Sequence, residues 1–130
     1  MKHLLIFLIL SACFSCAPDS GFKDEEKIIY YPGTEIVKQS VQYKNGKKNG
    51  YFKEYFRNGS LKASQVYLND TLNDTTLIYY ENKRLKTFHT YKNKLKHGCW
   101  RDYNKEGKLI SELFFKDGML DSVCSTYGYR

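Results

Sequence analysis

The feature that most constrains this chain of 130 residues is a tyrosine that recurs every 24 positions. This first series is Tyr31, Tyr55, Tyr79, Tyr103 and Tyr127. A second series lies 12 residues further on, and a third is aliphatic: Tyr43, Tyr67, Tyr91 and Phe115, then Val37, Leu61, Leu85 and Leu109. Recurrence at a fixed interval is the sequence signature of a repeat protein, in which small units stack to build one structure. The series therefore assign most of the aromatic residues to architecture rather than to chemistry.

The N-terminus carries the features of an export signal. Lys2 precedes an apolar run, Leu4 to Leu10, that is far shorter than the ~20 residues of a membrane span. The following Leu10-Ser11-Ala12-Cys13 resembles the lipobox of bacterial lipoproteins, in which the cysteine is lipidated and becomes the new N-terminus. Residues 1–12 are thus predicted to be a lipoprotein signal peptide, with palmitate-type acylation of Cys13. Cys16 is the alternative lipidation site, and an ordinary cleaved secretory signal is a further alternative.

A lipidated chain is anchored to a membrane without spanning it. We expect it in the bacterial cell envelope, on the outer membrane rather than the inner one. The polar stretch after the cysteine lacks periodicity, so residues 13–27 are predicted to be the lipidated cysteine and a flexible tether. Residues 28–130 then form a single repeat domain.

The formal net charge is +7. Several lysines fall in predicted loops: Lys44, Lys47, Lys48, Lys92, Lys94 and Lys96. They either serve solubility or attract an anionic lipid, an envelope glycan or an acidic protein. The export signal, and not the charge, argues against nucleic acid as a partner.

Each 24-residue unit contains two turn signals. The first signals are Asn45-Gly46, Asn69-Asp70, Asn93-Lys94 and Asp117-Gly118, and the second are Asn58-Gly59, Asn82-Lys83 and Glu106-Gly107. Asn and Gly tolerate the positive φ that tight hairpins require. Between the turns lie aromatic and β-branched runs that are typical of strands. The sequence predicts an all-β fold, an elongated antiparallel meander of stacked hairpins.

Two loop lengths are possible at Asn58-Gly59. A three-residue loop, residues 57–59, pairs Tyr55 with Leu61 and places all three recurring series on one packed face. Alternation then assigns the non-repeating residues to the opposite face. The aromatic residues Phe52, Phe56, Tyr80 and Trp100 are the candidate binding surface there; the alternative is a solvated or partly covered sheet face.

Residues 43–62 and 91–109 resemble the variant MORN repeat. The pattern is a glycine, an aromatic two residues on, a tyrosine three beyond that, and an Asn-Gly-x-Leu turn: Gly50, Phe52, Tyr55 and Asn58-Gly59-Ser60-Leu61, then Gly98, Trp100, Tyr103 and Glu106-Gly107-Lys108-Leu109. Residues 67–90 depart from it, with Asp74 for the glycine and Thr76 for the aromatic. The resemblance implies a β-meander that serves as a binding module for proteins or membranes. It implies structural roles for the tyrosines, leucines and glycines of the pattern.

Catalytic signatures are absent, so we predict neither an enzyme nor a cofactor or metal site. His89 and His97 occupy positions that hold unrelated residues in the other units, which indicates ordinary structural use. Cys99 and Cys124 are placed on opposite faces one repeat apart, too far for a disulfide.

The leading hypothesis is a lipid-anchored, non-enzymatic binding or scaffold module with an unknown envelope protein as partner. The first alternative is an antitoxin-like or immunity-type inhibitor of one cognate protein. The second is adhesion of the basic loops to anionic lipid or glycan.

Overall fold

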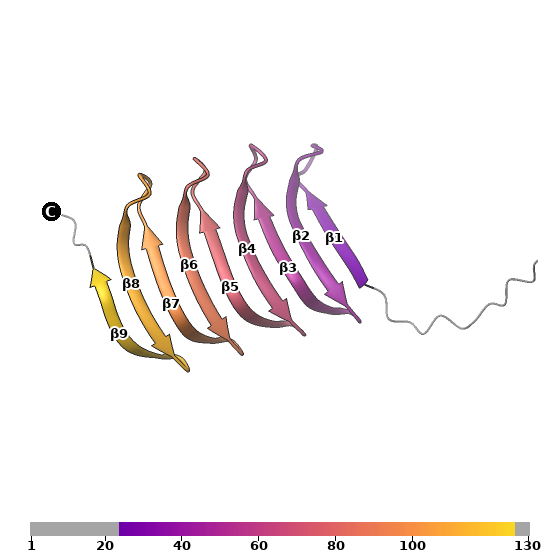
Figure 1. The fold of residues 1–130 in the computed structure, drawn as a ribbon. Coiled ribbons are helices and arrows are strands. Elements are labelled where there is room, and N and C mark those ends of the chain that lie inside the picture. Colours follow the sequence, from indigo (N-terminus) through magenta and orange to yellow (C-terminus); the bar gives the residue numbers. More distant parts are fainter. Residues whose placement is uncertain (1–23, 127–130) are drawn as a thin grey trace, which may run out of the picture.

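A computed structural model describes the backbone of residues 24–126 and the side chains of residues 24–123. Nine strands form one antiparallel sheet in sequence order, which confirms the predicted all-β meander (Figure 1). The strands are β1 Asp24–Tyr30, β2 Val37–Lys44, β3 Lys47–Tyr55, β4 Leu61–Leu68, β5 Thr71–Tyr79, β6 Leu85–Lys92, β7 Leu95–Tyr103, β8 Leu109–Lys116 and β9 Met119–Thr126. β1 begins inside the segment that was predicted to be a tether. The signal peptide, Cys13, Cys16 and Tyr127 lie outside the described residues.

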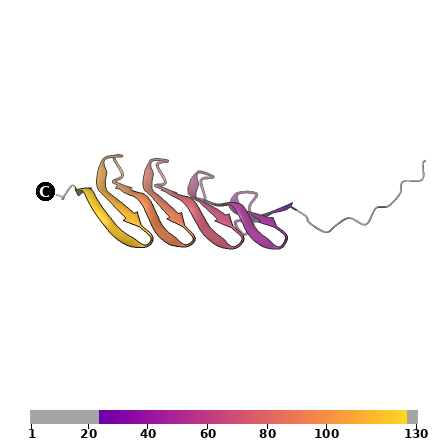
Figure 2. The same cartoon turned by 60° about the horizontal axis from the view of Figure 1, so that its bottom comes forward.

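Two kinds of turn alternate along the array, as the sequence predicts (Figure 2). The two-residue turns that join β2 to β3, β4 to β5, β6 to β7 and β8 to β9 have positive φ at both positions, for example 55° at Asn45 and 74° at Gly46. This is the type I′ geometry, whose twist matches that of the flanking strands. The repeated Asn and Gly residues are therefore explained by backbone conformation.

The other turns confirm the predicted three-residue loop. Tyr55 pairs with Leu61, and Gly59 has a φ of 80°. The Phe56 amide donates to the Ser60 carbonyl oxygen at 2.8 Å, and the Gly59 amide donates to the Phe56 carbonyl oxygen at 2.9 Å. The register shifts by one residue between Glu54 and Tyr55, which is a β-bulge. Equivalent bulges occur at Tyr79 and Tyr103.

The prediction that Tyr31 is structurally equivalent to Tyr55 is wrong. Tyr30 pairs with Val37, as Tyr55 pairs with Leu61, so Tyr30 is the structural equivalent of Tyr55. Tyr31 is the first residue of its loop and donates its amide to the Ile36 carbonyl oxygen. The first loop is one residue longer than the others, which shifts the tyrosine count without disturbing the hairpin.

Gly50 and Gly98 lie in a second kind of bulge, where three residues of one strand oppose one residue of its neighbour. Gly50 has a φ of 107°, and a Cβ atom there would lie 2.3 Å from Gln42 Oε1, which accepts a hydrogen bond from the Tyr51 amide. At Gly98 a Cβ atom would lie 2.8 Å from Thr90 Oγ1. These glycines are structural, because the side chain opposite crosses close to the bulged backbone.

The predicted division of residues between the two faces is wrong. Phe52 pairs with Gln65, and Gln65 lies two residues from Tyr67, so Phe52 shares a face with the recurring residues. Trp100 pairs with His89 and Leu113 and therefore lies on this face too. Simple alternation failed because the bulge at Glu54 and Tyr55 turns both side chains to one side. We call this face the ladder face.

The turns are also tied to one another from repeat to repeat. The amides of Asp70, Lys94 and Gly118 donate to carbonyl oxygens 22 residues earlier. A side chain adds to this contact in the third repeat, where His97 Nδ1 accepts from the Asp117 amide at 3.5 Å. Asn73 Oδ1 accepts from the Asn93 amide in the same way, at 3.2 Å. His97 thus takes the structural place of an asparagine.

The sheet is a single layer among the described residues, and it has no deep core. Among the side chains of residues 24–123, no large one is fully buried, and the buried apolar residues are Val41, Ala63 and Phe115. The other buried residues are small and polar: Ser40, Ser60, Ser64, Thr76 and Thr87. Long side chains that lean over small ones therefore provide the packing.

Candidate functional site

The largest aromatic cluster lies on the ladder face around Trp100. His89 stacks on the indole with ring centroids 3.7 Å apart, and the Lys96 ammonium lies 4.3 Å from the indole centroid. Tyr91 and Phe115 contact the same ring at 5.2 and 5.0 Å. Trp100 Nε1 donates to the Thr90 carbonyl oxygen at 2.9 Å. Since rings and the Lys96 ammonium contact the indole and its N–H is hydrogen-bonded, Trp100 is a central packing residue of the ladder face.

His89 belongs to a small polar group beside this cluster. Asp102 Oδ1 accepts from Thr87 Oγ1 at 3.0 Å and lies 3.2 Å from His89 Nε2. Burial lowers the pKa of His89, against the opposing effect of the Asp102 charge, with a further lowering from Lys96. Thr87 and His89 contact the same carboxylate oxygen, so the histidine does not lie between a hydroxyl and an acid. This arrangement lacks the geometry of a nucleophile with its general base.

The other predicted binding residues do not join Trp100 in one surface. Phe52 packs edge-on against Tyr67 at 6.0 Å, under the Lys48 ammonium at 5.4 Å. Phe56 and Tyr80 begin two of the loops, and Tyr80 Oη donates to the Tyr103 carbonyl oxygen at 2.9 Å. Strict alternation along the strands predicted one surface for the four residues. The bulges break that alternation, so the four side chains do not lie together.

The opposite side of the sheet, which we call the lysine face, was missed by sequence reasoning. Its cations, which face away from the aromatic ladder, are Lys38, Lys44, Lys47, Lys53, Lys62, Lys86, Lys92, Arg101 and Lys116. Most of these side chains are exposed. The signal was present in the sequence, because Lys38, Lys62 and Lys86 recur every 24 residues, as the tyrosines do.

Exposed apolar side chains accompany the lysines. Those on the lysine face are Ile28 (44% exposed), Tyr51 (50%), Leu68 (50%), Leu95 (49%), Phe114 (42%) and Met119 (74%). The Lys53 ammonium lies 5.2 Å from the Tyr51 ring centroid. By contrast, the aromatic residues of β3 to β8 on the ladder face are half-buried or buried. From β3 to β8 the exposed rings are therefore on the lysine face, together with most of the positive charge of the sheet, while Tyr30 of β1 is an exposed ring on the ladder face.

Acidic side chains are few on the lysine face: Asp24, Glu26 and Glu112. Glu112 Oε1 lies 2.5 Å from Arg101 Nε, and this hydrogen bond is the main cause that raises the pKa of Arg101. The same oxygen accepts from Cys99 Sγ at 3.7 Å.

The proposed separation of Cys99 and Cys124 remains a prediction, because the side chain of Cys124 lies outside the described residues. The register changes there, since Leu113 pairs with Trp100 on one side and with Val123 on the other. By the 24-residue count Cys124 is the equivalent of Trp100, but the pairing gives that place to Val123.

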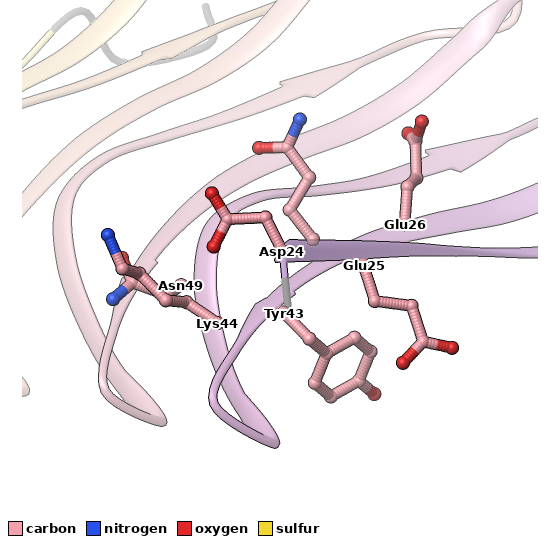
Figure 3. A pocket seen from close by; sticks show the side chains of 7 residues that line it. Asp24, Glu25, Glu26, Tyr43, Lys44 and Asn49 are labelled. Carbon is pink, nitrogen blue, oxygen red and sulfur yellow. The ribbon is translucent and has the colours of Figure 1, made fainter. Parts of the chain in front are cut away.

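A hollow of about 460 Å³ lies at the β1 end of the sheet (Figure 3). It is lined by Asp24, Glu25, Glu26, Gln42, Tyr43, Lys44 and Asn49. Glu26 Oε1 accepts from Ser40 Oγ at 3.0 Å, while Glu25 lies beside Tyr43 on the ladder face. Charged side chains on an edge strand discourage the addition of a further strand. The carboxylates that line the hollow are therefore explained as residues that protect the edge strand β1 from further pairing.

No protein-family model, curated protein or solved structure matches this chain. Residues 24–126 contain no helix long and apolar enough to cross a membrane. Within the same part of the chain, no group of three or more His, Cys, Asp or Glu residues is arranged to hold a metal ion.

Proposed function

We propose that this chain is a lipid-anchored protein of the bacterial cell envelope that acts as a non-enzymatic binding or scaffold module for another protein. The export signal and lipobox support the anchor. The resemblance of residues 43–62 and 91–109 to the variant MORN repeat supports a binding role by analogy.

The observation that carries the proposal is the uncovered ladder face. A sheet with one apolar face normally buries it against a second layer of structure. Here the face carries Tyr, Phe, Trp and Leu side chains over several strands, and no second layer covers it within residues 24–126. A protein partner with an apolar surface would cover it. A stable interface of this kind buries about 800 Å² on each partner.

The test uses two neighbouring residues of β5 that point to opposite faces. Ile78 pairs with Ala63 and Thr87 on the ladder face, and Leu77 pairs with Ser64 and Phe88 on the lysine face. Both are half-buried. The full-length lipidated chain is cross-linked in envelope membranes as the parent, as Ile78→Lys and as Leu77→Lys, with thermal unfolding to show that each variant is folded.

A protein captured by the parent and by Leu77→Lys, but not by Ile78→Lys, supports a partner on the ladder face. Its identity separates a scaffold from an inhibitor of one cognate protein. Equal capture by all three chains would overturn the proposal. The anchor is tested separately, by labelling with an alkyne fatty acid in Cys13→Ser and Cys16→Ser variants. Label that persists in both single variants and in the double variant would refute lipidation at either cysteine.

A further inference from the structure

The lysine face has an order that solubility alone does not explain. One row of exposed lysines, Lys38, Lys62 and Lys86, lies at equivalent positions of β2, β4 and β6. A second row, Lys44, Lys92 and Lys116, lies near the other end of β2, β6 and β8. Equivalent residues of successive repeats are two strands apart, which places them about 9–10 Å from one another. Both rows run across the strands, along the long axis of the sheet.

Little negative charge opposes these rows. Within residues 24–123, the carboxylates that form ion pairs with lysine-face cations are Glu112, with Arg101, and Glu54, with Lys62 at 3.8 Å. The ladder face is balanced by comparison, with Lys27, Lys48 and Lys96 against Glu25, Asp74 and Asp102. The positive field of the molecule is thus concentrated on one face, and such a face attracts an anionic partner.

Exposed rings lie between the two lysine rows. Tyr51 is in the middle of β3, and Phe114 is on β8 at the far end of the same face. The face of an aromatic ring carries partial negative charge, so it attracts polarised C–H groups such as those of a sugar ring. A partner that combines anionic groups with sugar rings would use both kinds of side chain.

We propose that the lysine face binds a linear acidic polysaccharide, which lies across the strands and pairs its carboxylates with the lysine rows. The shape of the sheet favours a chain over a flat surface. Each strand is bowed along its length, whereas the hairpins follow one another regularly along the array (Figures 1 and 2). A bilayer meets the bowed strands over a limited area, while a chain follows the direction of the rows. This polysaccharide site is on the face opposite to the one proposed for a protein partner, and it does not depend on that partner.

The experiment compares two triple variants that remove the same charge. Both are made in the full chain with Cys13→Ser and Cys16→Ser, so that no acyl chain enters the vesicles. Lys38→Gln/Lys62→Gln/Lys86→Gln removes the first row. Lys83→Gln/Lys105→Gln/Lys108→Gln removes three exposed lysines of the loops. The probes are polygalacturonate oligomers of increasing length, neutral dextran, polyglutamate, and vesicles of phosphatidylglycerol and phosphatidylcholine in equal parts. Binding is measured by fluorescence anisotropy or co-sedimentation at low and high salt.

Polygalacturonate should bind, with affinity that rises until the oligomer spans β2 to β6, a distance of about 19 Å. The row variant should bind about tenfold more weakly, because each exposed ion pair contributes a few-fold at most. The loop variant should bind within about twofold of the parent, since its lysines lie outside the rows. Tyr51→Ala, which keeps every charge, should also weaken binding of polygalacturonate but not of polyglutamate.

Four results would overturn the inference. They are binding to vesicles without binding to polygalacturonate, equal binding of polyglutamate, equal loss in both triple variants, and binding of dextran as strong as that of polygalacturonate. The first would assign the face to a membrane and the second to an acidic protein. Because the measurement uses purified chain and defined probes, it fails or succeeds independently of any protein partner on the ladder face.

Discussion

The same strands form both faces of this sheet, but the two faces differ in almost every side-chain property. On the ladder face, rings pack on one another and on small buried residues such as Ala63 and Thr76. On the lysine face, most of the cations are exposed and Tyr51 is half exposed. A repeat of 24 residues therefore encodes two surfaces at once, because successive side chains of a strand point to opposite sides. Packing uses one surface, and the other is left for charge.

On the ladder face, the recurring residues need additional rings between them. Equivalent residues of successive repeats are about 9–10 Å apart, too far for Tyr91 and Phe115 to pack directly. Trp100 lies between them and contacts both. The middle repeat has Thr76 at this position, so the contact is missing there. The side-chain packing of the ladder face is therefore expected to be weakest around β5.

The largest expected difference between the faces comes from removing one ring on each side. Trp100→Ala should lower the free energy of unfolding by about 2–4 kcal/mol, somewhat less than for a fully buried ring, because the contacts with His89, Tyr91 and Phe115 are lost. Phe114→Ala, on the exposed face of the next strand, should cost less than about 1 kcal/mol. Urea unfolding of both variants measures the difference. Equal losses would show that the lysine face contributes as much packing as the ladder face.

Two threonines on adjacent strands provide the next test. Thr76 Oγ1 is buried on the ladder face and has no hydrogen-bond partner within residues 24–123, so Thr76→Val should be neutral or stabilise by up to about 1 kcal/mol. Thr90 Oγ1 on the lysine face donates to the Cys99 carbonyl oxygen at 3.1 Å, and Thr90→Val should destabilise by about 1 kcal/mol. Thermal unfolding with matched valine variants checks both signs. A clear loss of stability in Thr76→Val would mean that its hydroxyl has a partner after all.

A smaller effect concerns pH and His89 on the ladder face. Burial lowers the pKa of His89 in the folded protein, so the unfolded chain binds the proton more readily. This histidine therefore makes stability fall as pH decreases through its ordinary pKa of 6.5 towards the lowered folded value, and the penalty is constant below that value. His89→Gln should flatten this part of the pH profile, measured as unfolding free energy between pH 7.5 and about 5. An unchanged slope in the variant would assign the pH dependence to other groups.

The smallest expected effect on stability comes from the lysine rows. The Lys38, Lys62 and Lys86 triple glutamine variant should unfold within about 0.5 kcal/mol of the parent in total, because exposed lysines contribute little to folding. The same urea experiment measures it, with the loop triple variant as the control. Substantial destabilisation of the row variant alone would show that the lysine face is part of the folding architecture.

Several features of the fold could be read from the sequence because they depend on short stretches of chain. The Asn and Gly positions predicted both kinds of turn, and the three-residue loop fixed the pairing of Tyr55 with Leu61. The placement of Phe52 and Trp100 could not be predicted by alternation. A bulge changes which residues share a face, and its position depends on the pairing with the neighbouring strand. The shift from Tyr31 to Tyr30 has a similar cause, a single extra residue in the first loop.

By itself, the sequence determined the repeat length, the turns and the order of the strands, because short loops allow a strand to pair only with its neighbour. The tertiary structure decided which side chains share a face and which lie close together. It grouped His89, Trp100 and Asp102 on one side, and it aligned Lys38, Lys62 and Lys86 on the other. The physical reason is that turn geometry is local, whereas the register of bulged strands is set by hydrogen bonds between residues far apart in the chain.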